Sequence, residues 1–322
     1  MKIHTQVKLS KSKFELEPPA GVFSIGSCFS VCIPKHLKSS KYSVFSNPCG
    51  ITYNPMSVAN QLNALNNQTP LSSTVFIEGK PYPLEHHGSF KKTTLDEQKQ
   101  NILDVWSVAQ EQFNDAQMLL ITLGTAFAFT YKDRFVNNCH RLPSKVFQEQ
   151  LLSVEQIVSA LKKPLCNWLN KDENKRVVLS VSPVRHLRNG LSGNSVSKST
   201  LRVACFQLSQ MSGVLYFPSY EIMLDELRGY RFYKDDLLHP SNLSEQIIWR
   251  RFQSWILSQR SEELCDLVSK LERSLAHSFE GTPEPSWIKA LERIMSQLEQ
   301  KYPDLDWSEE KARCKERTSK SI

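Results

Sequence analysis

Five short runs of apolar residues in this chain do not alternate with polar residues, and they are rich in β-branched side chains. They span residues 22–27, 44–47, 118–125, 177–183 and 214–219. Strands of a parallel sheet are buried on both faces and have this composition. The runs therefore predict five buried strands.

Stretches with helical spacing lie between these runs. Thr94 with Glu97, and Ser153 with Gln156, match the capping box that begins a helix. We expect Pro164 to end or kink the second of these helices. The apolar residues that then recur on one face of each helix are Ile102, Trp106, Ala109 and Phe113 in the first, and Ile157, Leu161 and Leu165 in the second.

Two further helices are predicted towards the C-terminal end of this pattern. One carries the apolar face Leu201, Cys205, Leu208 and Met211, with Gly213 as its expected C-cap. The other spans residues 243–256. Strands that alternate with helices predict a doubly wound α/β sandwich, which is a parallel five-stranded sheet with helices on both faces, flavodoxin-like in architecture.

The character of the chain changes after about residue 260, where charged helical segments replace the strand pattern. We expect an α/β domain over residues 1–259 and a helical extension over residues 260–322 that carries no chemistry. Residues 311–322 have almost nothing apolar to bury, so we expect this polar tail to be disordered.

Composition narrows the class of protein. The 322 residues are 40% hydrophobic, which is enough for a large core, and no apolar run is long enough to span a bilayer. The formal net charge of +7 suits an anionic substrate. It is not arranged as a basic stripe with aromatic residues between, so nucleic acid is not the expected partner. No signal-peptide pattern opens the chain, and we expect a cytoplasmic protein whose eight cysteines are reduced thiols.

Residues that could take part in catalysis occur at two places in the chain. The first strand runs into Gly26, Ser27 and Cys28, where a helix begins, and backbone N–H groups at that point favour a thiolate or an oxyanion. Far downstream, Asp236 and His239 lie three residues apart in a loop before a helix. This spacing lets the carboxylate orient the imidazole towards a nucleophile.

Taken together, these features resemble the SGNH/GDSL hydrolase superfamily, and within it the GSCFA family. The resemblance covers roughly residues 20–257, in order. The motifs that carry it are Gly26-Ser27-Cys28-Phe29, Asn47-Pro48-Cys49-Gly50, Asn54-Pro55, Thr122-Leu123-Gly124-Thr125-Ala126, Asn138-Cys139-His140, Val181-Ser182-Pro183-Val184-Arg185-His186 and Tyr230-Arg231-Phe232-Tyr233, which leads to Asp236 and His239-Pro240-Ser241.

The resemblance implies a catalytic triad. Registration on Gly26 places Cys28 at the position of the nucleophile and Ser27 at that of the preceding acid, and we favour Cys28 while keeping Ser27 as the alternative. His239 would be the general base and acid, and Asp236 would orient it.

The resemblance also implies an oxyanion hole, which is usually built from N–H groups and an asparagine side chain. Ala126 stands where the superfamily typically has that asparagine, so another residue would have to replace it. The candidates for oxyanion or substrate binding are Gly50, Asn54, Gly124, Thr125, Asn138, His140, Arg185 and His186.

The expected function is ester hydrolysis or acyl transfer through a covalent intermediate, with a small-molecule or glycan ester or thioester as substrate. The sequence does not decide between hydrolase and transferase. The alternative is a binding module that keeps the scaffold without turnover. No cofactor is expected. A metal site of Cys28, Cys32 and His36 is disfavoured, because their i, i+4, i+8 spacing suits a tetrahedral site poorly.

Overall fold

The computed structural model describes residues 5–277 and 284–319. By internal contacts the chain divides into two compact units. The first comprises Gly21–Pro34, Val44–Arg251 and the described residues up to Leu9. The second comprises Ser10–Ala20, Lys35–Ser43 and the described residues from Phe252 onward.

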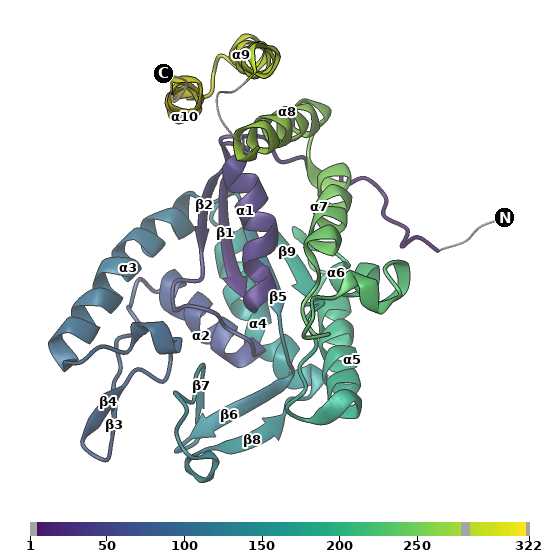
Figure 1. Ribbon diagram of the computed structural model, residues 1–322. Coiled ribbons are helices and arrows are strands. Elements are labelled where there is room, and N and C mark those ends of the chain that lie inside the picture. Colours follow the sequence, from purple (N-terminus) through teal and green to yellow (C-terminus); the bar gives the residue numbers. More distant parts are fainter. Residues whose placement is uncertain (1–4, 278–283, 320–322) are drawn as a thin grey trace. The chain divides into compact units, whose positions relative to one another are not determined.

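The first unit contains a five-stranded parallel sheet with the order β10-β9-β5-β1-β2 (Figure 1). Its strands are β1 (Gly21–Gly26), β2 (Ser43–Ser46), β5 (Met118–Leu123), β9 (Arg176–Val181) and β10 (Val214–Tyr216). All five predicted strands are confirmed. Numbered along the chain, the order is 2-1-3-4-5, the flavodoxin-like arrangement, in which ligands bind at the switch point between the first and third strands. Here that point lies between β1 and β5.

Both faces of the sheet are buried, which explains why its strands are continuously apolar. Phe23, Ile25, Leu119 and Ile121 belong to the main core cluster, while their neighbours Val22 and Leu120 on the other face are almost fully buried as well. The helices that pack in or near this core are α2 (Pro55–Asn66), α3 (Leu95–Asp115), α4 (Val154–Leu169) and α5 (Gly190–Leu208).

The capping boxes predicted at Thr94 and Ser153 are both formed, and α3 and α4 begin directly after them. Pro164 does not end α4, which continues to Leu169, so the prediction is wrong as to an end at this residue, while a kink there stays a prediction. The buried face of Leu161, Leu165 and Trp168 holds the helix together across the missing backbone hydrogen bond.

The C-cap prediction at Gly213 is also wrong. Helix α5 ends at Leu208 with Ser209 as its C-cap. Gly213 instead has φ +80° in the turn that enters β10, where the side chain of Leu169 approaches within 3.0 Å of the position a Cβ would take.

Two small antiparallel sheets were not predicted. One pairs β3 (Val75–Ile77) with β4 (Lys80–Tyr82), and the other has the order β7-β6-β8. Strand β6 spans Phe127–Tyr131, β7 spans Arg134–Val136 and β8 spans Gln148–Leu151. A separate apolar cluster that contains Tyr82, Val136 and Phe147 lies among these strands.

The remaining helices are α1 (Cys32–Ser39), α6 (Ser219–Glu221), α7 (Asn242–Ile256), α8 (Gln259–Ala276), α9 (Pro285–Lys301) and α10 (Ser308–Ser319). In the second unit, α8, α9 and the segment after α9 share an apolar core that includes Leu264, Leu298 and Trp307. The prediction of a disordered tail is wrong for residues 311–319, which belong to α10; residues 320–322 lie outside the described part. The proposed boundary at residues 259 and 260 stays a prediction.

Candidate functional site

Strand β1 ends at Gly26, where any side chain would collide with the neighbouring strand β5 unless the backbone moved. Gly26 has φ +156°, and a Cβ there would lie 2.2 Å from the Thr122 carbonyl oxygen of β5. Its N–H donates to Asn47 Oδ1 at 2.9 Å. The tight turn that follows places Cys28 at the first position of a short 3-10 helix (Cys28–Val31).

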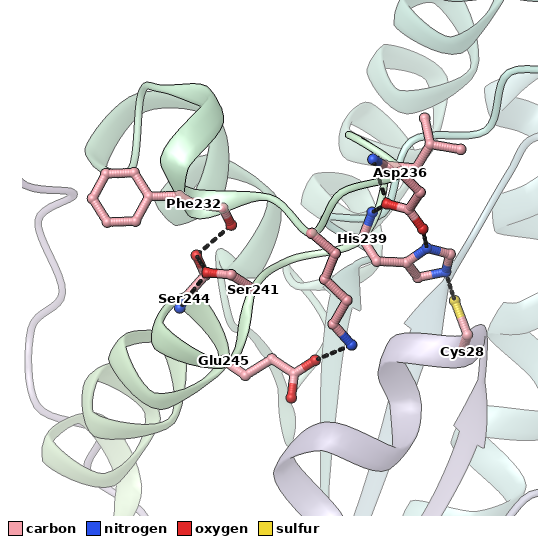
Figure 2. Close-up of polar contacts among 9 residues, drawn as sticks. Cys28, Phe232, Asp236, His239, Ser241, Ser244 and Glu245 are labelled. Carbon is pink, nitrogen blue, oxygen red and sulfur yellow. Dashed lines mark hydrogen bonds and ion pairs between the residues drawn. The ribbon is translucent and has the colours of Figure 1, made fainter.

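The loop before α7 is held by its own hydrogen bonds (Figure 2). Asp236 Oδ1 accepts from the backbone N–H of Leu238 at 2.9 Å and of His239 at 3.0 Å. The Ser244 hydroxyl donates to Phe232 O at 2.6 Å, which ties the preceding turn to the helix. These bonds fix the direction in which the imidazole of His239 leaves the loop.

The side chains of Cys28, His239 and Asp236 form a chain of polar contacts with His239 in the middle, which we call the relay (Figure 2). Cys28 Sγ lies 3.6 Å from His239 Nε2, and His239 Nδ1 lies 2.7 Å from Asp236 Oδ2. Hydrogen bonds from the backbone and from His239 lower the pKa of Asp236 to about 2. Because this carboxylate can only accept, Nδ1 carries the ring proton, and the lone pair of Nε2 faces the thiol.

The thiol of Cys28 has a raised pKa, because burial outweighs every contribution that favours the thiolate. The contributions that lower it are the positive charges of Lys198 and Lys234 and the N–H groups of Cys28 and Phe29. The N–H groups thus act as the sequence predicted, but they do not suffice to ionise the thiol at neutral pH. A base is needed, and Nε2 of His239 is the base in contact.

Ser27 has a different position. Its hydroxyl is buried and makes no hydrogen bond within residues 5–277 and 284–319. The structure therefore brings Cys28 and not Ser27 into hydrogen-bonding distance of His239. The catalytic roles of these residues remain predictions.

The N–H groups of the two glycines predicted for the oxyanion hole already donate hydrogen bonds within the protein. Gly50 donates to Asn47 O at 2.8 Å, and Gly124 donates to Tyr53 O at 2.9 Å. An oxyanion would have to replace these bonds in order to use either glycine.

The side chains of Asn54 and Thr125 also take part in hydrogen bonds within the protein. Asn54 is the N-cap of α2, where its Oδ1 accepts from Ser57 N at 2.9 Å, and its amide donates to Val136 O at 3.3 Å. Thr125 Oγ1 accepts from Phe127 N at 3.1 Å. Either side chain would have to give up a hydrogen bond within the protein in order to bind an oxyanion, and their role stays a prediction.

The remaining four candidates lie around the site in two groups. Asn138, His140 and His186 line one cavity, together with Asn54 and Thr125. The guanidinium of Arg185 lies over the ring of Tyr233 at 4.5 Å, and the backbone N–H of Arg185 donates to Leu238 O at 3.3 Å. Arg185 therefore supports the loop that carries His239.

Lys198 of α5 was missed by the sequence analysis. It is fully buried, and its Nζ donates to Gly124 O at 2.7 Å and to Ser182 O at 2.8 Å, at the carboxyl ends of β5 and β9. Burial lowers its pKa to about 7. The sequence signal was available, since Lys198 lies on the same helical face as Leu201 and Cys205 and a lysine on an apolar face is unusual.

Tyr53 was also missed, and nothing in the sequence pointed to it. Its ring lies near Gly124, and its pKa is raised by burial and by the negative charge that Cys28 would carry as a thiolate. The phenol therefore stays protonated and can donate a hydrogen bond.

No group of three or more His, Cys, Asp or Glu side chains suited to a metal ion occurs among the described residues. The eight cysteines are free thiols. Within the described part of the chain, no helix has the length and apolar character required to cross a membrane.

Comparison with known proteins identifies a family. The model of the GSCFA family matches residues 21–252. No curated protein matches the chain. Similar solved structures include an acetyl esterase mutant with acetate ion, at 8% identity and a TM-score of 0.36, and a carbohydrate esterase of family 3 from Talaromyces cellulolyticus, at 9% identity and a TM-score of 0.32. Each comparison covers 78% of this chain and 99% of the other.

Proposed function

The chain belongs to the GSCFA family, and we propose that it is a hydrolase or acyltransferase that forms a covalent acyl intermediate on Cys28. The single observation that carries the proposal is the relay in which His239 lies between the Cys28 thiol and the Asp236 carboxylate. A base in contact with a nucleophile and oriented by a third group is the arrangement that acyl transfer requires.

In the first step, His239 Nε2 takes the thiol proton of Cys28 while the sulfur attacks the carbonyl carbon of an ester or thioester. The carbonyl π bond breaks, and the tetrahedral intermediate carries the negative charge on oxygen. Asp236 stabilises the imidazolium that forms. The intermediate then expels the leaving group, which receives the proton from Nε2, and an acyl thioester remains on Cys28.

In the second step, an acceptor attacks the thioester carbonyl carbon and gives its proton to His239 Nε2, and a second tetrahedral intermediate forms with the negative charge on oxygen. When this intermediate collapses, the C–S bond breaks, and the thiolate of Cys28 leaves and recovers that proton from Nε2. Water as the acceptor gives hydrolysis, and an alcohol or amine gives transfer. An acceptor can reach this part of the site from solvent, since the side chains of His239 and Asp236 are 42% and 45% exposed.

The oxyanion would be bound by donors that are already near the sulfur. The N–H groups of Cys28 and Phe29 interact with the thiol and lower its pKa, so they lie near the point where charge develops. The phenol of Tyr53, whose ring lies near Gly124, is a further candidate donor, because its raised pKa keeps it protonated. This set differs from the one that the family resemblance implied.

A stopped-flow assay with p-nitrophenyl acetate tests the proposal. We expect a burst of about one equivalent of p-nitrophenol per chain, followed by slower turnover. His239→Ala should slow the burst about 100-fold or more, because it removes the base. His277→Ala, a matched histidine change in the second unit, should leave it unchanged. A burst of equal rate in His239→Ala would rule out the relay as its origin.

A binding module without turnover is the second candidate. The observation that favours it is that the N–H groups of Gly50 and Gly124 and the side chain of Asn54 are already hydrogen-bonded within the protein. A binding module would bind acyl esters but would neither release p-nitrophenol nor form an acyl adduct. The proposed enzyme would release p-nitrophenol and form the adduct.

A further inference from the structure

A cavity of about 320 Å³ lies at the carboxyl edge of the sheet, in the first unit. Its wall includes the aromatic residues Tyr53 and Phe129 and the polar residues Asn138, His140, Arg141, His186 and Arg188. We call this cavity the Arg141 pocket. The aromatic part is suited to an apolar or planar body, and the polar part to a charged or hydrogen-bonding end.

Tyr53 is shared by the wall of the Arg141 pocket and by the surroundings of Ser27, the residue before Cys28. A Cβ on Gly124 would lie 3.1 Å from Ser27 Cβ and 3.2 Å from Tyr53 Cδ1, so these two side chains border the same small space. Tyr53 also lines the pocket, and its pKa responds to a charge on Cys28. Tyr53 is thus the residue through which a ligand in the pocket is closest in the fold to the segment that carries Cys28.

The two arginines are the only charged side chains that line the pocket within the described residues. Its two histidines, His140 and His186, are uncharged at neutral pH, because burial lowers the pKa of each. Glu149 pairs with Arg188 at 3.5 Å and so partly neutralises that arginine. Arg141 makes no ion pair or hydrogen bond within the described part of the chain, which leaves one guanidinium for a ligand.

The turn that carries Arg141 is held in an unfavourable backbone conformation. His140 and Arg141 have φ values of +49° and +58°, which cost free energy for residues other than glycine. The turn is held by the His140 N–H, which donates to Asn138 Oδ1 at 2.7 Å, and by the His140 ring, which donates to Pro83 O at 3.0 Å. Strain of this kind, held by a rigid surround, is common at binding sites.

We propose that the Arg141 pocket binds an anionic group, carboxylate or phosphate, on the substrate that Cys28 attacks. Arg141 would supply the charge, and Tyr53 and Phe129 would contact the part of the substrate next to that group. The inference rests on the proposed function in one respect: the bound molecule is taken to be the acyl donor or acceptor. Binding of the anion itself does not depend on turnover.

Calorimetry on the Cys28→Ala chain, which cannot form an acyl adduct at this position, tests the pocket separately. The probes are phenylacetate and phenyl phosphate, with benzyl alcohol as the neutral counterpart. We expect at least one anion to bind more tightly than benzyl alcohol, and the tighter of the two identifies the carboxylate or the phosphate as the better ligand. Arg141→Gln should weaken that binding about tenfold or more, as expected for loss of a charge-assisted hydrogen bond.

Arg134→Gln is the matched control, since Arg134 is an exposed arginine that does not line the pocket. It should leave anion binding unchanged. The proposal is overturned if neither anion binds, if Arg141→Gln binds as well as its parent, or if Arg134→Gln weakens binding as much as Arg141→Gln does.

Protection of Cys28 tests the link to the candidate active site. In the chain with native Cys28, the tighter anion should slow alkylation by iodoacetamide, and Arg141→Gln should abolish this protection. Binding without protection would contradict the inference, because the pocket would then be separate from the thiol. Loss of the p-nitrophenol burst alone would overturn the proposed function and not the pocket.

Discussion

At the scale of single residues, the state of the Cys28 thiol decides how the site would work. Burial raises its pKa, and the positive charges that Lys198 and Lys234 carry when protonated only partly oppose that effect. A neutral thiol must lose its proton as it attacks, so His239 would act as a general base and not as the partner of a resting thiolate. The thiol would then lose its proton to His239 during the attack, as the serine hydroxyl does in a serine hydrolase.

Lys198 is the most unusual charge near Cys28. Its Nζ donates to two carbonyl oxygens, which matches the two N–H bonds of a neutral amine. The groups that face it are the Cys28 thiol, the imidazole of His186 and the ring of Tyr220, 5.9 Å from Nζ. Without a carboxylate partner among the described residues, burial holds its pKa at about 7, well below the ordinary 10.5.

This shift predicts a pH-dependent free energy of unfolding. Between pH 7 and 10.5 the unfolded chain binds a proton that the folded chain lacks, so stability rises with pH in this window, and the full destabilisation is present below pH 7. Relative to Lys198→Met, the wild-type chain should gain about 2 kcal/mol between pH 7 and 9 in urea titrations. Lys162→Met, at an exposed position, should show no such trend. A difference that stays flat with pH would mean that Lys198 is charged in the folded state.

The residue scale also shows where sequence reasoning reached its limit. Cys28, Asp236 and His239 could be chosen as candidates because they occur at motif positions, and the structure brings their side chains together. The occupied N–H groups of Gly50 and Gly124 were not foreseeable, since their partners Asn47 and Tyr53 are set by the course of loops. Hydrogen bonds of irregular backbone leave no periodic signal in a sequence.

At the scale of elements, the five strands of the main sheet were predictable because each is buried on both faces. Strands β6 and β8 were not, because β6 has only five residues and is mostly half-buried, and β8 is exposed at all four of its residues. The consequence is functional: Phe127 and Phe129 of β6 line the Arg141 pocket, so this wall could not be foreseen.

The close approach of β1 to β5 leads to a second prediction. Gly26→Ala would place a methyl group 2.2 Å from Thr122 O and would keep a φ of +156° that alanine rarely adopts. We expect a loss of at least about 2 kcal/mol in the free energy of unfolding, measured in urea. Gly88→Ala serves as the control, because open space surrounds its Cβ position, and should cost little. Equal stability of both variants would show that β1 and β5 move apart easily.

At the scale of the whole molecule, the candidate site belongs entirely to the first unit. The second unit has its own apolar core, in which α8 and α9 meet through Leu264, Leu271, Leu291 and Leu298. The change in sequence character after residue 260 foretold a helical region. Its final helix was missed, because α10 is strongly charged and contributes few apolar residues.

This division gives a third prediction. Leu298→Ala should cost about 2–5 kcal/mol of stability in the second unit, as is usual for a fully buried leucine. The rate of Cys28 alkylation by iodoacetamide should stay within about twofold of the wild-type rate in the absence of denaturant, because no residue of the candidate site lies in that unit. Leu103→Ala, at an exposed position of α3, is the matched control and should change neither quantity. A large change in the alkylation rate would show that the second unit shapes the site.

The identity of the attacking atom is the central claim, and mass spectrometry tests it most directly. The intact chain is treated with activated esters and acyl thioesters, and any adduct is mapped by peptide analysis. We expect one acyl group on Cys28, no adduct in Cys28→Ala, and an adduct in Ser27→Ala. An adduct on Ser27 that persists in Cys28→Ala and disappears in Ser27→Ala would contradict it.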